Sequence, residues 1–210
     1  REHGVTVRLS GSVSAILGEG GKVTGVGCPG GESLPAEMVV LGVGVIPNDW
    51  LAQTAGLDCA NGIVVDACSR TSDPAIVAAG DCTTHLLPHG AHQRLESVQN
   101  ALEQAKSAAA WLLGQERPFT ATPWFWSDQY EVKLQMAGLS AGHDSFVLRG
   151  DPENYAGSVL YFVGDKLVAV DSLNRAQDHA AGRRLIEKGR SPTKAQAADP
   201  AFPLMSLAKD

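Results

Sequence analysis

The chain has 210 residues, of which 44% are hydrophobic, and its formal net charge is -6. This composition is ordinary for a globular protein with a buried core. The acidic balance argues against nucleic acid or an anionic membrane surface as a partner. No apolar run approaches the roughly 20 residues of a membrane span, and the first residues show no signal-peptide pattern. We therefore expect a cytoplasmic protein without a membrane partner.

The first 35 residues alternate between apolar and polar positions around glycines. This pattern predicts strands over residues 5–9, 12–16 and 22–26, with a hairpin turn at Gly18-Glu19-Gly20-Gly21. Because the chain enters this pattern directly from Arg1, we expect it to begin within a domain. No residue of the segment suggests chemistry.

A nearly continuous apolar run follows from Met38 to Asn48. Such a run is typical of a strand buried on both faces in a parallel sheet. Gly42 and Gly44 would share one face of this strand, where missing side chains leave room for a flat ring or a dinucleotide. The alternative is a strand end softened by glycine, because lone glycines are weak signals.

Three further elements lead to the most informative turn in the sequence. We predict a short helix over residues 48–57, a strand over 63–66 and a second strand over 76–79, which runs into Gly80-Asp81. Ligands bind at the carboxyl ends of strands in open α/β sheets. Asp81 is therefore a candidate ligand-contacting residue.

The cysteines lack the spacing of a metal site, and the spacing of three histidines would suit a metal only on a helix. Cys28, Cys59, Cys68 and Cys82 form no C-x-x-C pair, so we expect free thiols rather than a redox dithiol. Residues 82–94 contain three histidines at spacings of four and three, His85, His89 and His92. Pro88 and Gly90 fall among them and argue against a helix, which favours a solvated loop.

Residues 96–113 form the most helical stretch of the chain, with apolar residues at spacings of three and four, and Gly114 ends it. The free N–H groups at its start are suited to an anion or an electron-rich ring. A long core helix without a ligand explains the pattern equally well.

A linker with two prolines, at residues 116–123, precedes a change of pattern. We predict strands over residues 131–136, 145–148, 158–162 and 166–170, then helices over 176–188 and 192–198. This order predicts an α+β domain with an antiparallel sheet. In a strand, Trp124 and Trp126 would share a face opposite Phe125, so that the tryptophans could cover a ligand while Phe125 anchors the segment.

Four segments together resemble the FAD-dependent ferredoxin reductases of bacterial oxygenase systems. They are Val39 to Asn48, Ala78 to Cys82, Glu96 to Ala105, and the Pro-Trp-Phe-Trp-Ser-Asp-Gln-Tyr run over residues 123–130. The aromatic run makes the combination specific, and the order of the segments matches across nearly the whole chain.

The resemblance implies a cofactor site and an electron-transfer function. Asp81, with Gly80, would hydrogen-bond FAD near its ribityl and pyrophosphate portion, and Val98 would direct its N–H toward the flavin. Trp126 would lie near the flavin on the side where a [2Fe-2S] ferredoxin docks, and Gly44 near the nicotinamide. Hydride would pass from NADH or NADPH to FAD, and single electrons would then pass to the ferredoxin.

The chain departs from the family pattern in two ways. Gln99 stands where some members have proline, a change of small expected cost. In addition, neither G-x-G-x-x-G turn of such reductases is present, and the family is about twice as long. We therefore expect an α/β and α+β chain in which partial FAD/NAD(P)-binding doubly wound domains precede the α+β domain, with the amino-terminal half of the same protein missing.

The expected divisions are residues 1–47 from the NADH domain, 48–117 from the FAD domain and 118–210 as the C-terminal domain. Two rival interpretations are a disulfide reductase-like flavoprotein and a non-catalytic fragment used for dimerisation or partner binding. His179-Ala180-Ala181-Gly182-Arg183 does not match the His-Pro-Thr motif of the disulfide reductases. A basic helix with Arg183, Arg184 and Lys188, followed by Arg190, either meets an acidic ferredoxin or is a solvated face.

Overall fold

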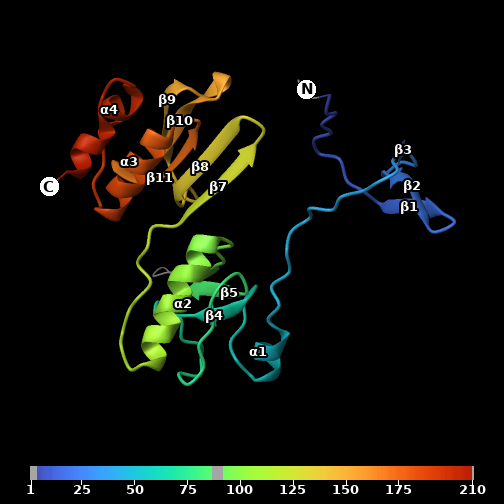
Figure 1. Cartoon of the computed structure of the whole chain (residues 1–210), viewed down its shortest axis with the longest axis horizontal. Coiled ribbons are helices and arrows are strands. Elements are labelled where there is room, and N and C mark those ends of the chain that lie inside the picture. The colour runs from blue at the N-terminus through green and yellow to red at the C-terminus, as the bar shows by residue number, and fades with distance from the viewer. Residues whose placement is uncertain (1–3, 87–91, 210) are drawn as a thin grey trace. The chain divides into compact units, whose positions relative to one another are not determined.

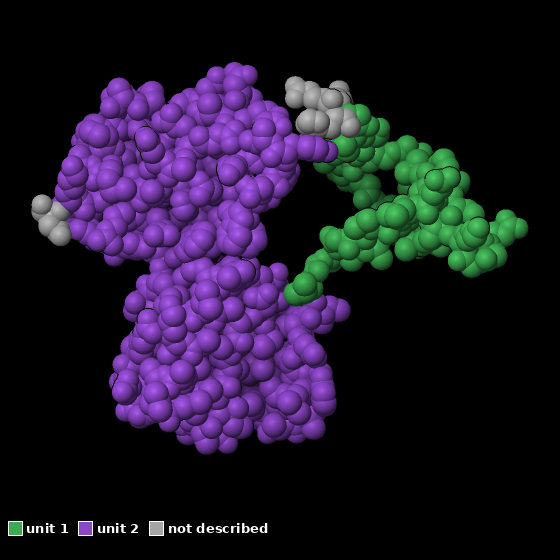
Figure 2. All heavy atoms as spheres, in the orientation of Figure 1, with its two compact units in different colours: residues 1–45 green, residues 46–210 purple. Residues whose placement is uncertain are grey.

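A computed structural model describes residues 4–86 and 92–209. The chain divides into two compact units, residues 1–45 and residues 46–210 (Figure 2), and each is described by itself. Among the helices of the described residues, none is long and apolar enough to cross a bilayer.

The first unit is built on a small antiparallel sheet of β1 (Ala15–Glu19), β2 (Lys22–Gly27) and β3 (Ser33–Pro35). Gly20 and Gly21 adopt φ values of 57° and 76° between β1 and β2, a conformation that glycine permits. The predicted hairpin is confirmed. The predicted strand over residues 5–9 is wrong, because this segment has no strand structure.

The apolar run that begins at Met38 is not a strand. Residues 38–49 have no regular secondary structure, and Val40 and Val43 are 86% and 90% exposed. A strand buried on both faces needs hydrogen-bonded neighbours and a covering layer on each side. Among the described residues, no strand pairs with this run, so the predicted buried strand is wrong.

The second unit begins with a small α/β layer (Figure 1). Its elements are α1 (Trp50–Thr54), β4 (Ile63–Val65), β5 (Thr83–Leu86), β6 (His92–Gln93) and α2 (Val98–Leu112). β4 and β5 are parallel, and β6 is antiparallel to β5. The short helix and the first strand lie within the predicted ranges, and the parallel pair agrees with a partial doubly wound domain.

The strand predicted over residues 76–79 is wrong. Val77 makes only an isolated bridge with Arg70, and the regular strand β5 begins at Thr83, inside the predicted loop. The Gly80-Asp81 turn therefore precedes a strand instead of following one. His89 lies in residues 87–91, outside the described residues, so the three-histidine loop is described only in part.

Helix α2 buries a polar face. Ser97 caps it by accepting a hydrogen bond from the backbone N–H of Asn100. The buried residues of the helix are Asn100, Gln104, Ser107 and Ala108, whereas the large apolar residues Val98, Leu102 and Leu112 are exposed. The helix was predicted correctly, but hydrogen bonds rather than its apolar residues determine which face packs.

A five-stranded antiparallel sheet forms most of the remainder, in the order β7-β8-β11-β10-β9. The strands are β7 (Trp124–Gln129), β8 (Val132–Gly138), β9 (Ser145–Asp151), β10 (Ala156–Val163) and β11 (Lys166–Leu173), with the 3-10 helix η1 (Pro152–Asn154) before β10. The predicted α+β domain with an antiparallel sheet is confirmed.

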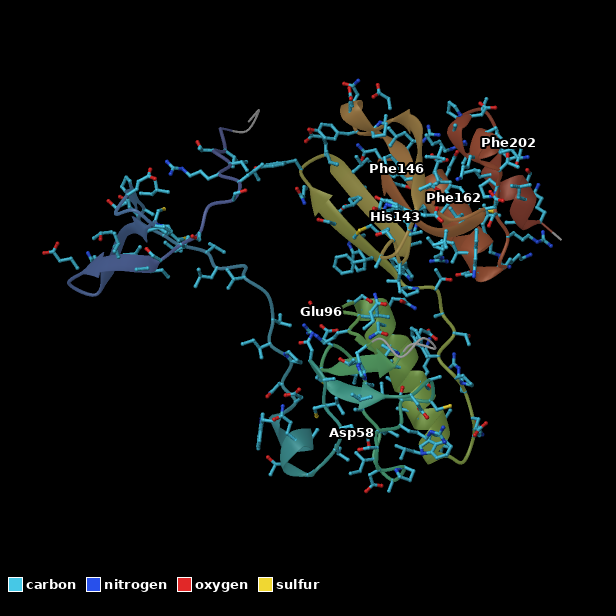
Figure 3. The ribbon with its side chains drawn as sticks, turned by 180° about the vertical axis from the view of Figure 1, so that it is seen from behind. Asp58, Glu96, His143, Phe146, Phe162 and Phe202 are labelled. Atoms are coloured by element: carbon cyan, nitrogen blue, oxygen red, sulfur yellow. The ribbon has the colours of Figure 1, made fainter. Side chains whose placement is uncertain are left out.

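Helical elements pack on the sheet and enclose the main core (Figure 1). These elements are α3 (Ala176–Glu187), α4 (Lys194–Ala198) and the 3-10 helix η2 (Leu204–Ala208). Leu160, Phe162 and Leu185 are fully buried between the layers (Figure 3). A Cβ at Gly182 would lie 2.5 Å from Cγ1 of Val170, so glycine allows α3 to pack closely on β11.

Arg149 on β9 holds the irregular carboxyl-terminal segment against this domain. Its side chain is only 3% exposed, and its Nε donates to Oδ1 of Asp178 at 3.0 Å. Its two terminal nitrogens donate to backbone carbonyls of the segment, namely those of Gln196, Ala197, Asp199, Pro200 and Phe202. One guanidinium therefore satisfies carbonyls that regular secondary structure leaves without partners.

Replacing Arg149 by methionine is expected to lower the free energy of unfolding by about 3–5 kcal/mol, because backbone carbonyls would lose their buried donor and Asp178 would be left with the more exposed Arg175 as its cationic partner. Urea titration followed by circular dichroism measures the change. Arg184→Met is the matched control, since Arg184 is exposed and pairs with Glu187 at the surface, and it should cost less than about 1 kcal/mol. Equal losses in the two variants would contradict the buried role of Arg149.

Candidate functional site

The Gly80-Asp81 turn is fixed by local hydrogen bonds. Gly80 has a φ of 90°, and its carbonyl accepts from the backbone N–H of Thr83 at 3.0 Å and from the Thr83 hydroxyl at 2.8 Å. The side chain of Asp81 is exposed next to this turn. A carboxylate on a fixed turn can accept hydrogen bonds from a ligand without first being ordered.

Gln104 of α2 joins this turn to the helix. Its Oε1 accepts from the N–H of Gly80 at 2.7 Å and lies 3.0 Å from the Thr83 hydroxyl oxygen, whose single proton is shared between Oε1 and the Gly80 carbonyl. The same oxygen accepts from Nδ2 of Asn100, one helical turn earlier, at 3.1 Å. A Cβ at Gly80 would lie 3.8 Å from Cβ of Ala101, so the turn and the helix are in direct contact.

His85 on β5 completes the buried network. Its Nε2 lies 3.1 Å from Oδ1 of Asn100 and 3.0 Å from Nε2 of Gln104. Burial lowers the pKa of His85, and the Asn100 hydrogen bond opposes this in part. The other side of the imidazole contacts the Phe119 ring, with centroids 5.0 Å apart. A neutral imidazole therefore lies between helix and linker.

The start of α2 lies beside the turn. Arg94 donates to the carbonyl of Asp81 at 3.4 Å and pairs with Glu96 at 2.6 Å. Val98, the first helical residue, is 61% exposed, and the first turn of the helix carries no acidic residue. The positive end of the helix dipole is thus not neutralised by the helix itself, which suits an anionic or electron-rich group.

A pocket of about 270 Å³ connects the start of α2 with the sheet of the C-terminal domain. Leu95, Glu96 and Ser97 line one side of it, and Trp124, Phe125 and Met136 are among the residues on the other side. Polar backbone at the helix start therefore faces an apolar wall, the usual composition of a cofactor or ligand site.

The aromatic cluster is arranged differently from the prediction. Trp124 and Trp126 share a strand face as expected, with ring centroids 5.5 Å apart. Trp124, however, packs against the core and against His179, whereas Phe125 is 42% exposed and lines the pocket. Trp124 rather than Phe125 anchors the segment, because its face of β7 is the one that meets α3.

The structure brings together three of the five predicted cofactor residues. Gly80 and Asp81 lie beside the helix that begins at Val98, whereas Trp126 is on β7; none of these four residues is among those that line the pocket. Gly44 belongs to the unit of residues 1–45, where its φ is 126° and a Cβ added to it would meet no described atom within 4 Å.

The sequence interpretation missed the three residues that connect the site, His85, Asn100 and Gln104. The available signal was the row of polar residues at positions 100, 104 and 107 of a helix, which share one face. The four cysteines are free thiols, and among the described residues no group of three or more potential ligands could hold a metal ion.

Two families of known proteins match the chain. Residues 1–105 match the family described as pyridine nucleotide-disulphide oxidoreductase, and residues 124–208 match the reductase C-terminal domain. The chain belongs to the pyridine nucleotide-disulphide oxidoreductase family. The doubly wound and α+β fold classes expected from the sequence are both consistent with these matches.

Curated relatives show which proteins of this family the chain resembles. The chain is 46% identical over 204 residues to rhodocoxin reductase of Rhodococcus erythropolis, covering 97% of this chain and 48% of the relative. It is 44% identical over 189 residues to putidaredoxin reductase of Pseudomonas putida, covering 89% and 45%. The predicted resemblance to bacterial ferredoxin reductases is confirmed, and the chain spans about half the length of the curated relatives it matches.

Two solved structures of ferredoxin reductases also resemble the chain. A covalent complex of putidaredoxin reductase with putidaredoxin matches with a TM-score of 0.91 and 41% identity, covering 98% of this chain and 50% of the other. A ferredoxin reductase from Rhodopseudomonas palustris matches with a TM-score of 0.88 and 45% identity, covering 95% and 50%.

The buried His85 should make stability depend on pH. Its folded pKa lies below the ordinary value of 6.5, so the unfolded chain binds more protons and stability falls as pH is lowered through and below about 6.5. His85→Gln should reduce the slope of unfolding free energy against pH in this window. Burial, with Arg183 nearby, also lowers the pKa of His179, so part of the slope should persist.

The measurement is urea unfolding at several pH values. His92→Gln, which replaces an exposed imidazole, is the matched control and should keep the full slope. A slope for His85→Gln equal to that of the unchanged chain would contradict the prediction.

Proposed function

We propose that this chain is the carboxyl-terminal half of an FAD-dependent ferredoxin reductase that passes electrons from a nicotinamide nucleotide to a ferredoxin. The observation that carries the proposal is the contact between the Gly80-Asp81 turn and the start of α2, both held by Gln104. Strong similarity to reductases of this kind over nearly the whole chain supports it.

The residues at this contact fit a flavin. Asp81 offers an exposed acceptor for hydroxyl groups of the ribityl chain, and the exposed Val98 begins a helix whose first turn carries no acidic residue. When bound, FAD would accept hydride from the nicotinamide and release electrons one at a time. The role of the chain is to orient that group and stabilise negative charge beside the helix start.

The remaining site and partner assignments are proposed on the family resemblance. Trp126 would lie on the ferredoxin side of the flavin and Gly44 near the nicotinamide, which could be that of NADH or NADPH. The ferredoxin would carry a [2Fe-2S] cluster, and the solved putidaredoxin reductase–putidaredoxin complex supports a partner of this kind. The divisions at residues 1–47, 48–117 and 118–210, and a cytoplasmic location, also stay predictions.

The basic helix offers little support for a docking role. Arg183 and Arg184 both pair with Glu187, at 3.4 Å and 3.3 Å. Arg190 donates to the carbonyls of Leu207 and Lys209. These cations are engaged within their own domain, which favours the solvated-face interpretation.

The geometry around His179 argues against a disulfide reductase. His179 is 6% exposed, its Nε2 has no hydrogen-bond partner, and its ring meets Trp124 edge-on. A histidine that serves as an acid or base must reach its substrate and is usually oriented by an acidic group. His179 satisfies neither condition.

Reduction of ferricyanide by NADH and by NADPH tests the proposal. The full-length protein that contains this chain should catalyse the reaction with bound FAD, and the 210-residue chain should not. Full-length protein that binds no flavin would support the non-catalytic interpretation and overturn the proposal.

The isolated chain is expected to bind FAD weakly or not at all, because it contains neither glycine-rich dinucleotide turn. The chain is mixed with excess FAD and passed through a gel-filtration column, and absorbance at flavin wavelengths is measured across the protein peak. A stoichiometric yellow chromophore in that peak would refute the expectation.

A further inference from the structure

We propose that Gln104 is a positioning residue for the flavin, acting through the Gly80-Asp81 turn without touching the cofactor. This inference rests on the proposed function, since it concerns how the same site is held. It assigns a role to a residue that lies on the buried face of α2, away from the exposed helix start.

The first step is the position of the Gln104 side chain. The residue is completely buried, and three donor groups on three different elements converge on its Oε1, although the Thr83 hydroxyl shares its single proton with the Gly80 carbonyl. These donors are the Gly80 N–H of the turn, the Thr83 hydroxyl of β5 and the Asn100 amide of α2. A single atom therefore fixes the distance between the turn that bears Asp81 and the helix that begins at Val98.

The second step is that Gln104 carries the hydrogen bond between the turn and α2, whereas Thr83 and Arg94 bond the turn from outside the helix. The predicted strand before Gly80 is absent apart from one isolated bridge at Val77. The Gly80 N–H is part-buried against α2, where loss of its acceptor leaves a donor less well satisfied. Removing Oε1 should therefore let the turn move away from α2, and Asp81 with it.

The third step concerns the nitrogen of the same amide. Nε2 of Gln104 lies 3.0 Å from Nε2 of His85, and the same ring nitrogen lies 3.1 Å from Oδ1 of Asn100. The neutral imidazole accepts from the Gln104 amide in the tautomer without a proton on Nε2 and donates to Asn100 in the other. A glutamate at this position would keep the oxygen that receives Gly80 and would place its second oxygen beside His85, where a protonated imidazole could donate to it.

Four variants separate positioning from general packing. Gln104→Met keeps the length of the side chain and removes the acceptor, and Gln104→Glu keeps the acceptor. Gln115→Met makes the same chemical change at an exposed position just beyond α2 and is the matched control. Thr83→Val, which removes one hydroxyl from the network, serves as a milder variant should Gln104→Met not fold.

The first readout needs no flavin. Amide hydrogen exchange of Gly80, followed by NMR in the 210-residue chain, should accelerate about tenfold in Gln104→Met, the change expected for loss of one buried hydrogen bond. Thr83→Val should produce a smaller acceleration in the same direction. Gln104→Glu should retain slow exchange and raise the pKa of His85, visible in its imidazole proton shifts. Unchanged exchange in Gln104→Met, or in Thr83→Val if that variant replaces it, would overturn the inference.

The second readout uses the full-length reductase. In Gln104→Met the dissociation constant of FAD should rise about tenfold or more and the flavin absorbance bands should shift, while the KM for the nicotinamide nucleotide stays unchanged. Gln104→Glu should restore both flavin properties. Faster Gly80 exchange with unaltered FAD affinity would overturn the positioning role alone, whereas absence of FAD from the unsubstituted protein would overturn the proposed function and this inference with it.

Discussion

The side-chain oxygen of Gln104 is buried and must be satisfied by hydrogen bonds, and this requirement determines the geometry of the candidate site. Three donors from a turn, a strand and a helix converge on it. An unsatisfied buried polar group costs about 1–3 kcal/mol, so each of these elements is held where the others need it. A fully satisfied network of this kind specifies one arrangement, whereas apolar packing tolerates several.

The same principle recurs at Arg149 in the C-terminal domain. There a buried guanidinium donates hydrogen bonds to an irregular segment, and at Gln104 a buried amide oxygen accepts a hydrogen bond from an irregular turn. In both cases a polar side chain of a regular element bonds backbone groups beyond that element, among them the Gly80 N–H and the Phe202 carbonyl. The chain thus uses its regular elements as supports for irregular backbone.

Sequence patterns predicted the structure correctly where both interacting segments belong to this chain, as in the β1–β2 hairpin, α2 and the C-terminal sheet. The turn position alone indicates Asp81 as a ligand contact, and the family resemblance narrows this to an FAD contact, which stays a prediction. Prediction failed at the run beginning at Met38, which has the composition of a central strand but no neighbour among the described residues. It also failed at Thr83 and His85, which resemble a loop yet are buried in a strand because hydrogen bonds to α2 satisfy them. Apolar patterns do not reveal burial of this kind.

The polar packing of α2 leaves apolar residues of this helix exposed to water. With its hydrogen-bonding side chains turned inward, the helix presents Val98, Leu102 and Leu112 outward, and its alanines at 105 and 109 lie in the same row. These five positions are spaced by four and three residues, like the seam of a coiled coil. A solvent-exposed seam of this kind favours self-association, so the molar mass of the isolated chain obtained from light scattering should increase with protein concentration and its melting temperature should depend on concentration.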